Sequence, residues 1–138
     1  MGRTASQSSI GEIYGKIKIK AQSQMLAKDI KVDDFDGIFF VGGGGAAVYF
    51  EDETVHDIAR QFYAKGKLVS AICIAPVILA NAGLLQNKKA TVFPDGADAL
   101  LQNGAIYTGN SVEVDGKIVT GNGPQAATEF AEALLKVI

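Results

Sequence analysis

Apolar residues recur with two different periods along this chain, and the two periods predict strands and helices in turn. Continuous apolar runs at 37–41 and 68–72 are typical of strands buried on both faces of a parallel sheet. Between them, residues 52–65 show helical spacing, with acidic residues in the first turn and Gly66 after the last. The apolar face of this helix comprises Val55, Ile58, Ala59, Phe62 and Tyr63. Strand, helix and strand in this order predict a parallel β-α-β unit.

Shorter elements separated by turn residues are predicted in the second half of the chain. They are a helix at 76–82, a strand at 90–93, a helix at 96–102 and a hairpin over 112–120 that turns at Asp115-Gly116. The chain ends in a helix from Pro124, whose apolar face comprises Ala127, Phe130, Ala131, Leu134 and Ile138. Strands that alternate with helices indicate an α/β fold with a largely parallel sheet.

The N-terminal segment has a different pattern. Residues 10–21 alternate apolar and charged side chains, with Ile17 and Ile19 set against lysines, and Gly15 interrupts the alternation. This pattern predicts a two-stranded ribbon with one solvated face.

Composition narrows the class of protein. The 138 residues suit one domain over 1–138, and 48% of them are hydrophobic. A net charge of −2 from 13 basic and 15 acidic residues gives no excess of positive charge that would favour binding to nucleic acid or to a membrane surface. No apolar run approaches the roughly 20 residues that span a bilayer. One cysteine and one histidine predict neither a disulfide nor a zinc site, so we expect no metal or other cofactor and a cytoplasmic location.

The single cysteine, Cys73, is the strongest candidate for chemistry. It follows the strand at 68–72, and Pro76, a residue favoured at the first helical position, comes three residues later. A thiol at such a point faces unpaired backbone N–H groups and the positive end of a helix dipole, both of which favour thiolate. The plainer alternative is a buried small apolar residue.

The position of Cys73 favours a functional role, because crevices in open α/β sheets lie beyond the carboxyl ends of the strands. The run Gly42–Gly45 ends the neighbouring strand, and its N–H groups are candidates for stabilising an oxyanion in the same crevice. Phe93-Pro94 either walls this crevice or packs in the core. His56, the only histidine, is expected on the surface, and an approach through space to Cys73 remains open.

The glycine run also fits a dinucleotide fingerprint loosely, through Gly42, Gly44 and Ala47. The acidic residue expected at the end of the next strand is absent, and so is the lysine of a phosphate-binding loop. Nucleotide binding is therefore the least favoured of the readings.

Several stretches together resemble the ThiJ/PfpI family of the class I glutamine amidotransferase-like superfamily. They are Asp34–Gly43, Lys65–Cys73, Ala75-Pro76, Leu79–Gly83, Lys88–Thr91, Phe93-Pro94, Val112–Gly116 and Gly123-Pro124 with the helix that follows. The resemblance implies a flavodoxin-like three-layer sandwich with a mostly parallel sheet. It also implies that Cys73 is the nucleophile at the strand–helix elbow, with oxyanion-hole N–H groups from Gly43 and Ile74.

The chain departs from the family pattern in three places. Ile74 stands where peptidase-like members have a histidine directly after the cysteine, and Phe93 stands where another branch has a histidine before the proline. The initial strand, its glutamate-bearing turn and a long helix are also missing, so we expect a domain truncated at its N-terminus. An absent central strand leaves apolar faces and strand edges uncovered, which predicts self-association as a dimer or larger oligomer.

The resemblance implies two classes of function. One is a cysteine-dependent hydrolase, peptidase-like or glyoxalase/deglycase-like, acting on a small carbonyl compound or a peptide with weakened or lost activity. The other is a non-catalytic oligomeric stress, redox-sensing or chaperone-like protein. Fold and elbow do not choose between them.

Overall fold

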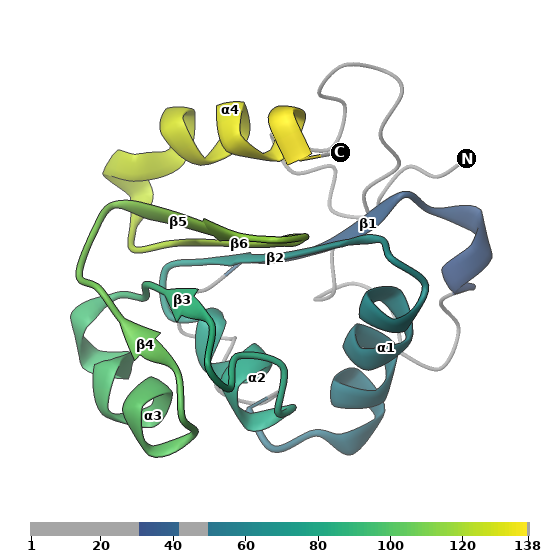
Figure 1. Cartoon of the computed structure of the whole chain (residues 1–138), viewed down its shortest axis with the longest axis horizontal. Coiled ribbons are helices and arrows are strands. Elements are labelled where there is room, and N and C mark those ends of the chain that lie inside the picture. Colours follow the sequence, from purple (N-terminus) through teal and green to yellow (C-terminus); the bar gives the residue numbers. More distant parts are fainter. Residues whose placement is uncertain (1–30, 42–49, 138) are drawn as a thin grey trace.

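A computed structural model describes residues 31–41 and 50–137, and a four-stranded sheet lies at its centre (Figure 1). Its strands are β1 (Gly37–Val41), β2 (Leu68–Ile72), β5 (Val112–Asp115) and β6 (Ile118–Gly121). The order is β1-β2-β6-β5, with β1, β2 and β6 parallel and β5 antiparallel to β6. The predicted buried strands and the hairpin at Asp115-Gly116 are therefore confirmed.

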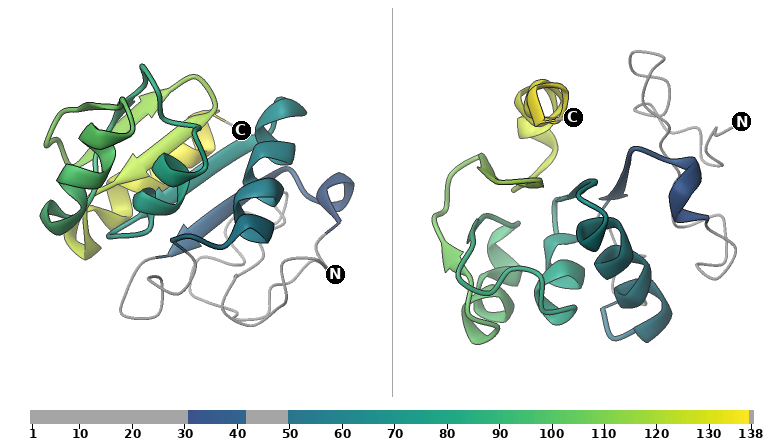
Figure 2. Two further views of the ribbon diagram at one scale, coloured as in Figure 1. Left: turned by 90° about the horizontal axis from the view of Figure 1, so that it is seen from below. Right: turned by 45° about the vertical axis from the view of Figure 1, so that its right-hand side comes forward.

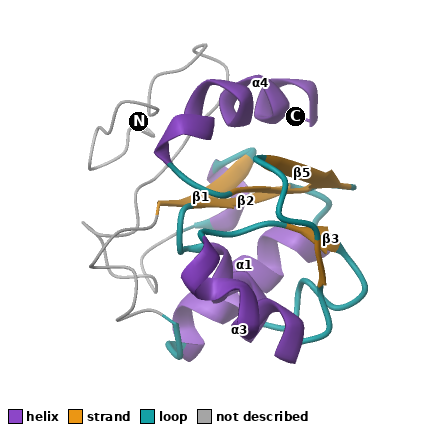
Figure 3. Ribbon diagram, turned by 90° about the vertical axis from the view of Figure 1, so that its left-hand side faces the viewer, coloured by secondary structure: helices purple, strands orange, loops and turns teal. Residues whose placement is uncertain are grey.

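Helices cover both faces of the sheet and make three layers (Figures 1 and 3). They are α1 (Glu53–Ala64), α2 (Pro76–Asn81), α3 (Ala97–Gln102) and α4 (Ala127–Val137). Of these four helices, α4 lies on one face, and α1, α2 and α3 lie on the other, where Figure 2 shows α2 between its two neighbours. This arrangement confirms the predicted α/β, flavodoxin-like fold.

α1 forms where the sequence predicts it because its start is capped. The Asp52 carboxylate accepts hydrogen bonds from the N–H groups of Thr54, at 2.9 Å, and of Val55, at 3.2 Å. Gly66 follows the helix with φ 74°, a conformation that glycine adopts without steric cost. Four of the five predicted face residues are buried, and Tyr63 is half-buried.

α4 is shifted by part of a turn from its prediction. Pro124–Ala126 form a 3-10 turn, so the α-helix begins at Ala127, and Ala127 is exposed where burial was expected. Phe130 and Leu134 are buried as predicted, and the Phe130 ring lies 5.3 Å from the ring of Phe39 in β1.

The strand predicted at 90–93 is wrong in its bounds. β3 covers only Lys89–Ala90 and pairs with β4 (Ile106–Tyr107) outside the main sheet. It ends there because the Thr91 N–H donates to the Thr120 hydroxyl at 3.0 Å, and the Phe93 N–H donates to the carbonyl of Cys73 at 2.8 Å. The helix expected from Gly96 begins at Ala97, after a 3-10 turn over Pro94–Gly96.

The predicted N-terminal ribbon at 10–21 and the glycine run Gly42–Gly45 lie outside the described residues. Within the described ranges, no helix has the length and apolar character needed to cross a membrane.

Candidate functional site

Cys73 follows the last residue of β2 and has a backbone conformation that non-glycine residues rarely adopt. Its φ is 67°, in the left-handed region, a conformation that costs about 1–3 kcal/mol and persists only where the surroundings hold it. Two hydrogen bonds hold its peptide groups. The Cys73 N–H donates to the Gly121 carbonyl at 3.0 Å, and the Cys73 carbonyl accepts from the Phe93 N–H at 2.8 Å. The chain therefore turns sharply at Cys73 while remaining joined to β6.

The thiol is half-buried and packs against the apolar cluster between the sheet and α4. Burial raises the pKa of the Cys73 thiol above its ordinary value, because the charged thiolate loses solvation. Burial therefore acts against the expected stabilisation of the thiolate by N–H groups and a helix dipole. α2 begins only at Pro76 and has six residues, so its dipole is small and lies beyond the thiol.

Ile74 stands at the first position of the turn into α2. The next N–H groups are used within this turn, since Ala75 donates to the Ile72 carbonyl at 3.2 Å and Val77 donates to the Ile74 carbonyl at 3.1 Å. In the described part of the chain, the Ile74 N–H donates to no backbone carbonyl. Among the residues that the structure describes, nothing occupies this N–H, so it can serve as a donor beside Cys73. Gly43, the other predicted donor, lies outside the described residues.

The carboxyl ends of β1 and β2 lie side by side, since Val41 pairs with Ile72 in the parallel register. Phe93 is 42% exposed, so its ring does not belong to the core, and its N–H bonds the carbonyl of Cys73. Gly96 comes three residues after Phe93 in the sequence. A Cβ atom at Gly96 would come within 2.8 Å of the Val77 and Val92 Cγ2 atoms, so only glycine fits here.

Asn122 is a polar residue near the elbow that sequence reasoning missed. It follows Gly121, the residue bonded to Cys73, and its own N–H donates to the Ser111 carbonyl at 3.0 Å. Its Oδ1 atom is buried and has no hydrogen-bond partner among the described residues. The sequence Asn-Gly-Pro predicts only a turn, so it gives no sign of a buried side chain at Asn122.

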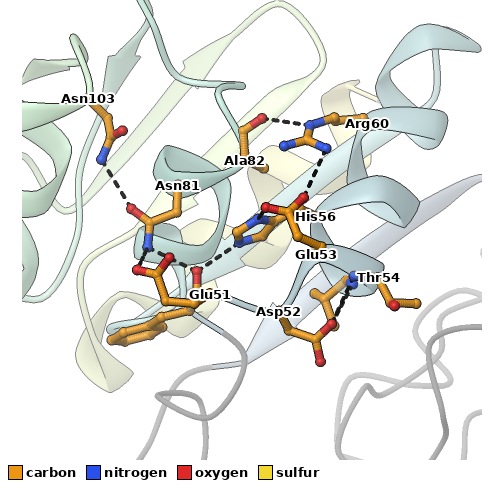
Figure 4. Close-up of polar contacts among 11 residues, drawn as sticks. Glu51, Asp52, Glu53, Thr54, His56, Arg60, Asn81, Ala82 and Asn103 are labelled. Carbon is orange, nitrogen blue, oxygen red and sulfur yellow. Dashed lines mark hydrogen bonds and ion pairs between the residues drawn. The ribbon is translucent and has the colours of Figure 1, made fainter.

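His56 is not the surface residue that the sequence predicts. Its side chain is 2% exposed, and its Nε2–H donates to the Phe50 carbonyl at 2.7 Å (Figure 4). This bond requires the tautomer or charge state with a proton on Nε2. The other ring nitrogen lies 3.8 Å from the Glu53 carboxylate. The polar contacts of His56 therefore go to Phe50 and Glu53, not to Cys73.

The described residues offer Cys73 no general base. No hydrogen bond in these ranges joins its thiol to a histidine or a carboxylate, and the same ranges hold no cluster of three or more His, Cys, Asp or Glu residues suited to a metal ion. The arrangement can present a thiol and an N–H donor to a carbonyl group, with the thiol largely protonated at neutral pH.

Comparison with known proteins identifies the family of this chain. The model of the DJ-1/PfpI family matches residues 3–137. An uncharacterised protein of Methanocaldococcus jannaschii is 40% identical over 131 residues, which cover 93% of this chain and 64% of that protein. Deglycase PfpI of Pyrococcus furiosus is 30% identical over 128 residues, covering 93% of this chain and 77% of the deglycase.

The solved structures that resemble this chain include members of the same family. The crystal structure of a ThiJ/PfpI domain protein from Brachyspira murdochii superposes with a TM-score of 0.79 at 31% identity, covering 81% of this chain and 65% of that chain. The present chain thus spans slightly less than two thirds of the Methanocaldococcus protein and of the Brachyspira chain.

Proposed function

Because this chain belongs to the DJ-1/PfpI family, we propose that it is a slow, cysteine-dependent deglycase-like hydrolase with Cys73 as its nucleophile. The observation that carries the proposal is the left-handed backbone of Cys73 at the carboxyl end of β2. A relative that covers 93% of this chain is named a deglycase, which supports a small carbonyl adduct as the substrate.

The first chemical step follows from the elbow. The Cys73 thiolate adds to a carbonyl carbon, so a C–S bond forms while the C=O π bond breaks and its electron pair moves to oxygen. The Ile74 N–H, and the N–H of Gly43 that the family resemblance implies, would donate hydrogen bonds to that oxyanion. The hydrogen on the thiohemiacetal carbon then moves to the neighbouring ketone carbon, so the first carbon is oxidised to a thioester while the second is reduced to an alcohol. Water attacks the thioester carbonyl carbon, the C–S bond breaks, and the hydroxy acid leaves while the sulfur departs as thiolate. For methylglyoxal the overall change is addition of water to give lactate, so no external oxidant or reductant is needed.

The raised pKa of Cys73 is the reason for expecting slow turnover. Nucleophilic catalysis requires thiolate, and the described residues supply neither a base nor a cation to form it at neutral pH. We therefore expect turnover that increases with pH.

The test is turnover of methylglyoxal, of a methylglyoxal adduct of an amino acid and of a chromogenic peptide, by the wild type and by Cys73→Ser. The proposal predicts that the first two are consumed and that Cys73→Ser abolishes this activity. Equal rates for the two proteins would overturn it, and turnover of the peptide alone would reassign the substrate class to peptides. Thr128→Ser, an exposed change on α4, serves as the matched control.

The second candidate is a redox-sensing protein that turns over no carbonyl substrate. Its lack of turnover is favoured by the absence of a base among the described residues and by the apolar surroundings of the thiol. This candidate predicts Cys73 oxidation by peroxide with no turnover of any of the three substrates.

We also propose that the chain associates with further copies of itself. Among the described strands, β1 is an edge of the sheet, and Val41 at its end is 52% exposed. Unpaired edges invite pairing with another chain. Sedimentation velocity is expected to show a dimer or larger species, and a stable compact monomer would contradict this part.

A further inference from the structure

A hydrogen-bond network surrounds the far end of α2, the helix that begins three residues after Cys73 (Figure 4). Asn81 is the last residue of α2. Its Nδ2 group donates to the Phe50 carbonyl at 2.9 Å and to the Glu51 carboxylate at 3.3 Å. His56 in α1 donates to the same Phe50 carbonyl at 2.7 Å. One carbonyl therefore joins the end of α2 to the first turns of α1.

The same network reaches α3. Asn103, the residue after α3, donates from Nδ2 to the Asn81 Oδ1 at 3.1 Å and to the Ala99 carbonyl at 2.9 Å. On the other side, the Arg60 Nε–H donates to the Ala82 carbonyl, directly after α2, at 2.9 Å. The end of α2 is thus joined to both of its neighbours in the layer.

α2 requires such support for a physical reason. A helix of six residues is not stable by itself, so tertiary contacts must fix its position. At its start the chain leaves Cys73 in the left-handed region, a conformation that persists only where the surroundings hold it. The hydrogen bonds to Gly121 in β6 and from Phe93 hold the peptide groups of Cys73, and α2 follows directly after the turn.

We propose that Asn81 is a positioning residue for Cys73, acting through α2, and that His56 assists it through the shared Phe50 carbonyl. The role of this elbow in turnover rests on the proposed function, whereas the conformation of Cys73 does not. When the end of α2 is released, the helix shifts, Cys73 relaxes toward a common backbone conformation and the Ile74 N–H changes direction.

Release of α2 has two consequences: the thiol reacts faster with an alkylating agent, and the enzyme turns over its substrate more slowly. The thiol becomes better solvated, so its thiolate fraction at neutral pH increases and alkylation becomes faster. Turnover becomes slower because the oxyanion donor is no longer in place. A loss of global stability does not by itself produce this pair of changes in the folded protein.

The test uses neutral substitutions, so that no new charge acts on the thiol. Asn81→Leu removes the link to α1 and α3, and His56→Leu removes the second donor. His56→Gln retains an N–H donor at similar reach and is the conservative rescue. The control is Val32→Ala, a buried position before β1 at the opposite end of the parallel strands from Cys73.

Iodoacetamide alkylation of Cys73 is measured against pH at a temperature where circular dichroism shows every variant folded. Asn81→Leu and His56→Leu are expected to speed alkylation at neutral pH at least about threefold, with a profile shifted to lower pH. They are also expected to lower kcat/KM for the carbonyl substrate about tenfold. His56→Gln and Val32→Ala are expected to follow the wild type.

Two results would overturn the inference. One is an Asn81→Leu profile that superimposes on the wild type, and the other is a Val32→Ala variant of equal stability that reproduces the shift. If the wild type itself turns over no substrate, the proposed function fails, but the alkylation comparison still decides the role of Asn81.

Discussion

The two ends of α2 hold the backbone in opposite ways. Three residues before its start, Cys73 has φ 67° and a half-buried thiol with no polar partner in the described ranges. At its end, Asn81 donates to two acceptors and accepts from Asn103. Backbone strain therefore lies just before α2, where only the peptide groups of Cys73 are hydrogen-bonded, and side-chain hydrogen bonds hold the end of the helix. A short helix can present a strained, reactive residue where its opposite end is fixed by neighbours that take no part in the chemistry.

The largest expected effect comes from filling the space at the start of α2. Gly96→Val places side-chain atoms where the Val77 and Val92 methyl groups already lie, so we expect a loss of about 3 kcal/mol in the free energy of unfolding. Urea denaturation measures this loss. The neighbouring exposed change Asp95→Ala serves as the control, with an expected effect within about 0.5 kcal/mol. Equal stability of the two variants would show that the start of α2 is loosely packed.

A smaller loss is expected at the far end of α2. Asn81→Leu removes three hydrogen bonds and leaves the Phe50 carbonyl with one donor, which costs about 2 kcal/mol. Since Asn103 shares one of these bonds, the double variant with Asn103→Ala should lose less than the sum of the two single losses. Strict additivity in urea denaturation would mean that the network is not coupled.

Relief of strain at Cys73 is expected to stabilise the protein. Cys73→Gly removes the cost of the left-handed conformation and should raise the free energy of unfolding by about 1 kcal/mol. Asn87→Gly is a matched control, because Asn87 has φ 64° but asparagine adopts this region readily. Its gain should be only a few tenths of a kcal/mol. A Cys73→Gly variant less stable than the wild type would argue against strain at the elbow.

The smallest effect concerns the pH dependence of stability. Because burial raises the pKa of Cys73 above that of the unfolded chain, the folded state favours the neutral thiol. The resulting stability is fully present below the pKa of the unfolded thiol and is lost as pH rises through the folded pKa. The wild type should therefore lose stability relative to Cys73→Ser between neutral and alkaline pH. Parallel stability curves for the two proteins would contradict the shift.

β1, β2, the hairpin of β5 and β6, and α1 could be predicted because the local pattern agrees there with the final structure. The burial of His56 could not, because its stability inside the protein depends on the Phe50 carbonyl, which the helical pattern does not place. The left-handed backbone of Cys73 is equally hidden, since an apolar run before a proline is compatible with an ordinary turn. The link between Asn81 and Asn103 joins two helices and follows only from the way α2 and α3 pack.

The pH dependence of kcat/KM for a methylglyoxal adduct tests the central claim most directly. If Cys73 is the nucleophile and burial keeps it protonated, kcat/KM rises from about pH 6 to about pH 9 in parallel with the alkylation rate of the same thiol. The same activity is absent from Cys73→Ser. A profile that is flat over this range, or turnover that survives in Cys73→Ser, would contradict the assignment of Cys73 as the reactive group.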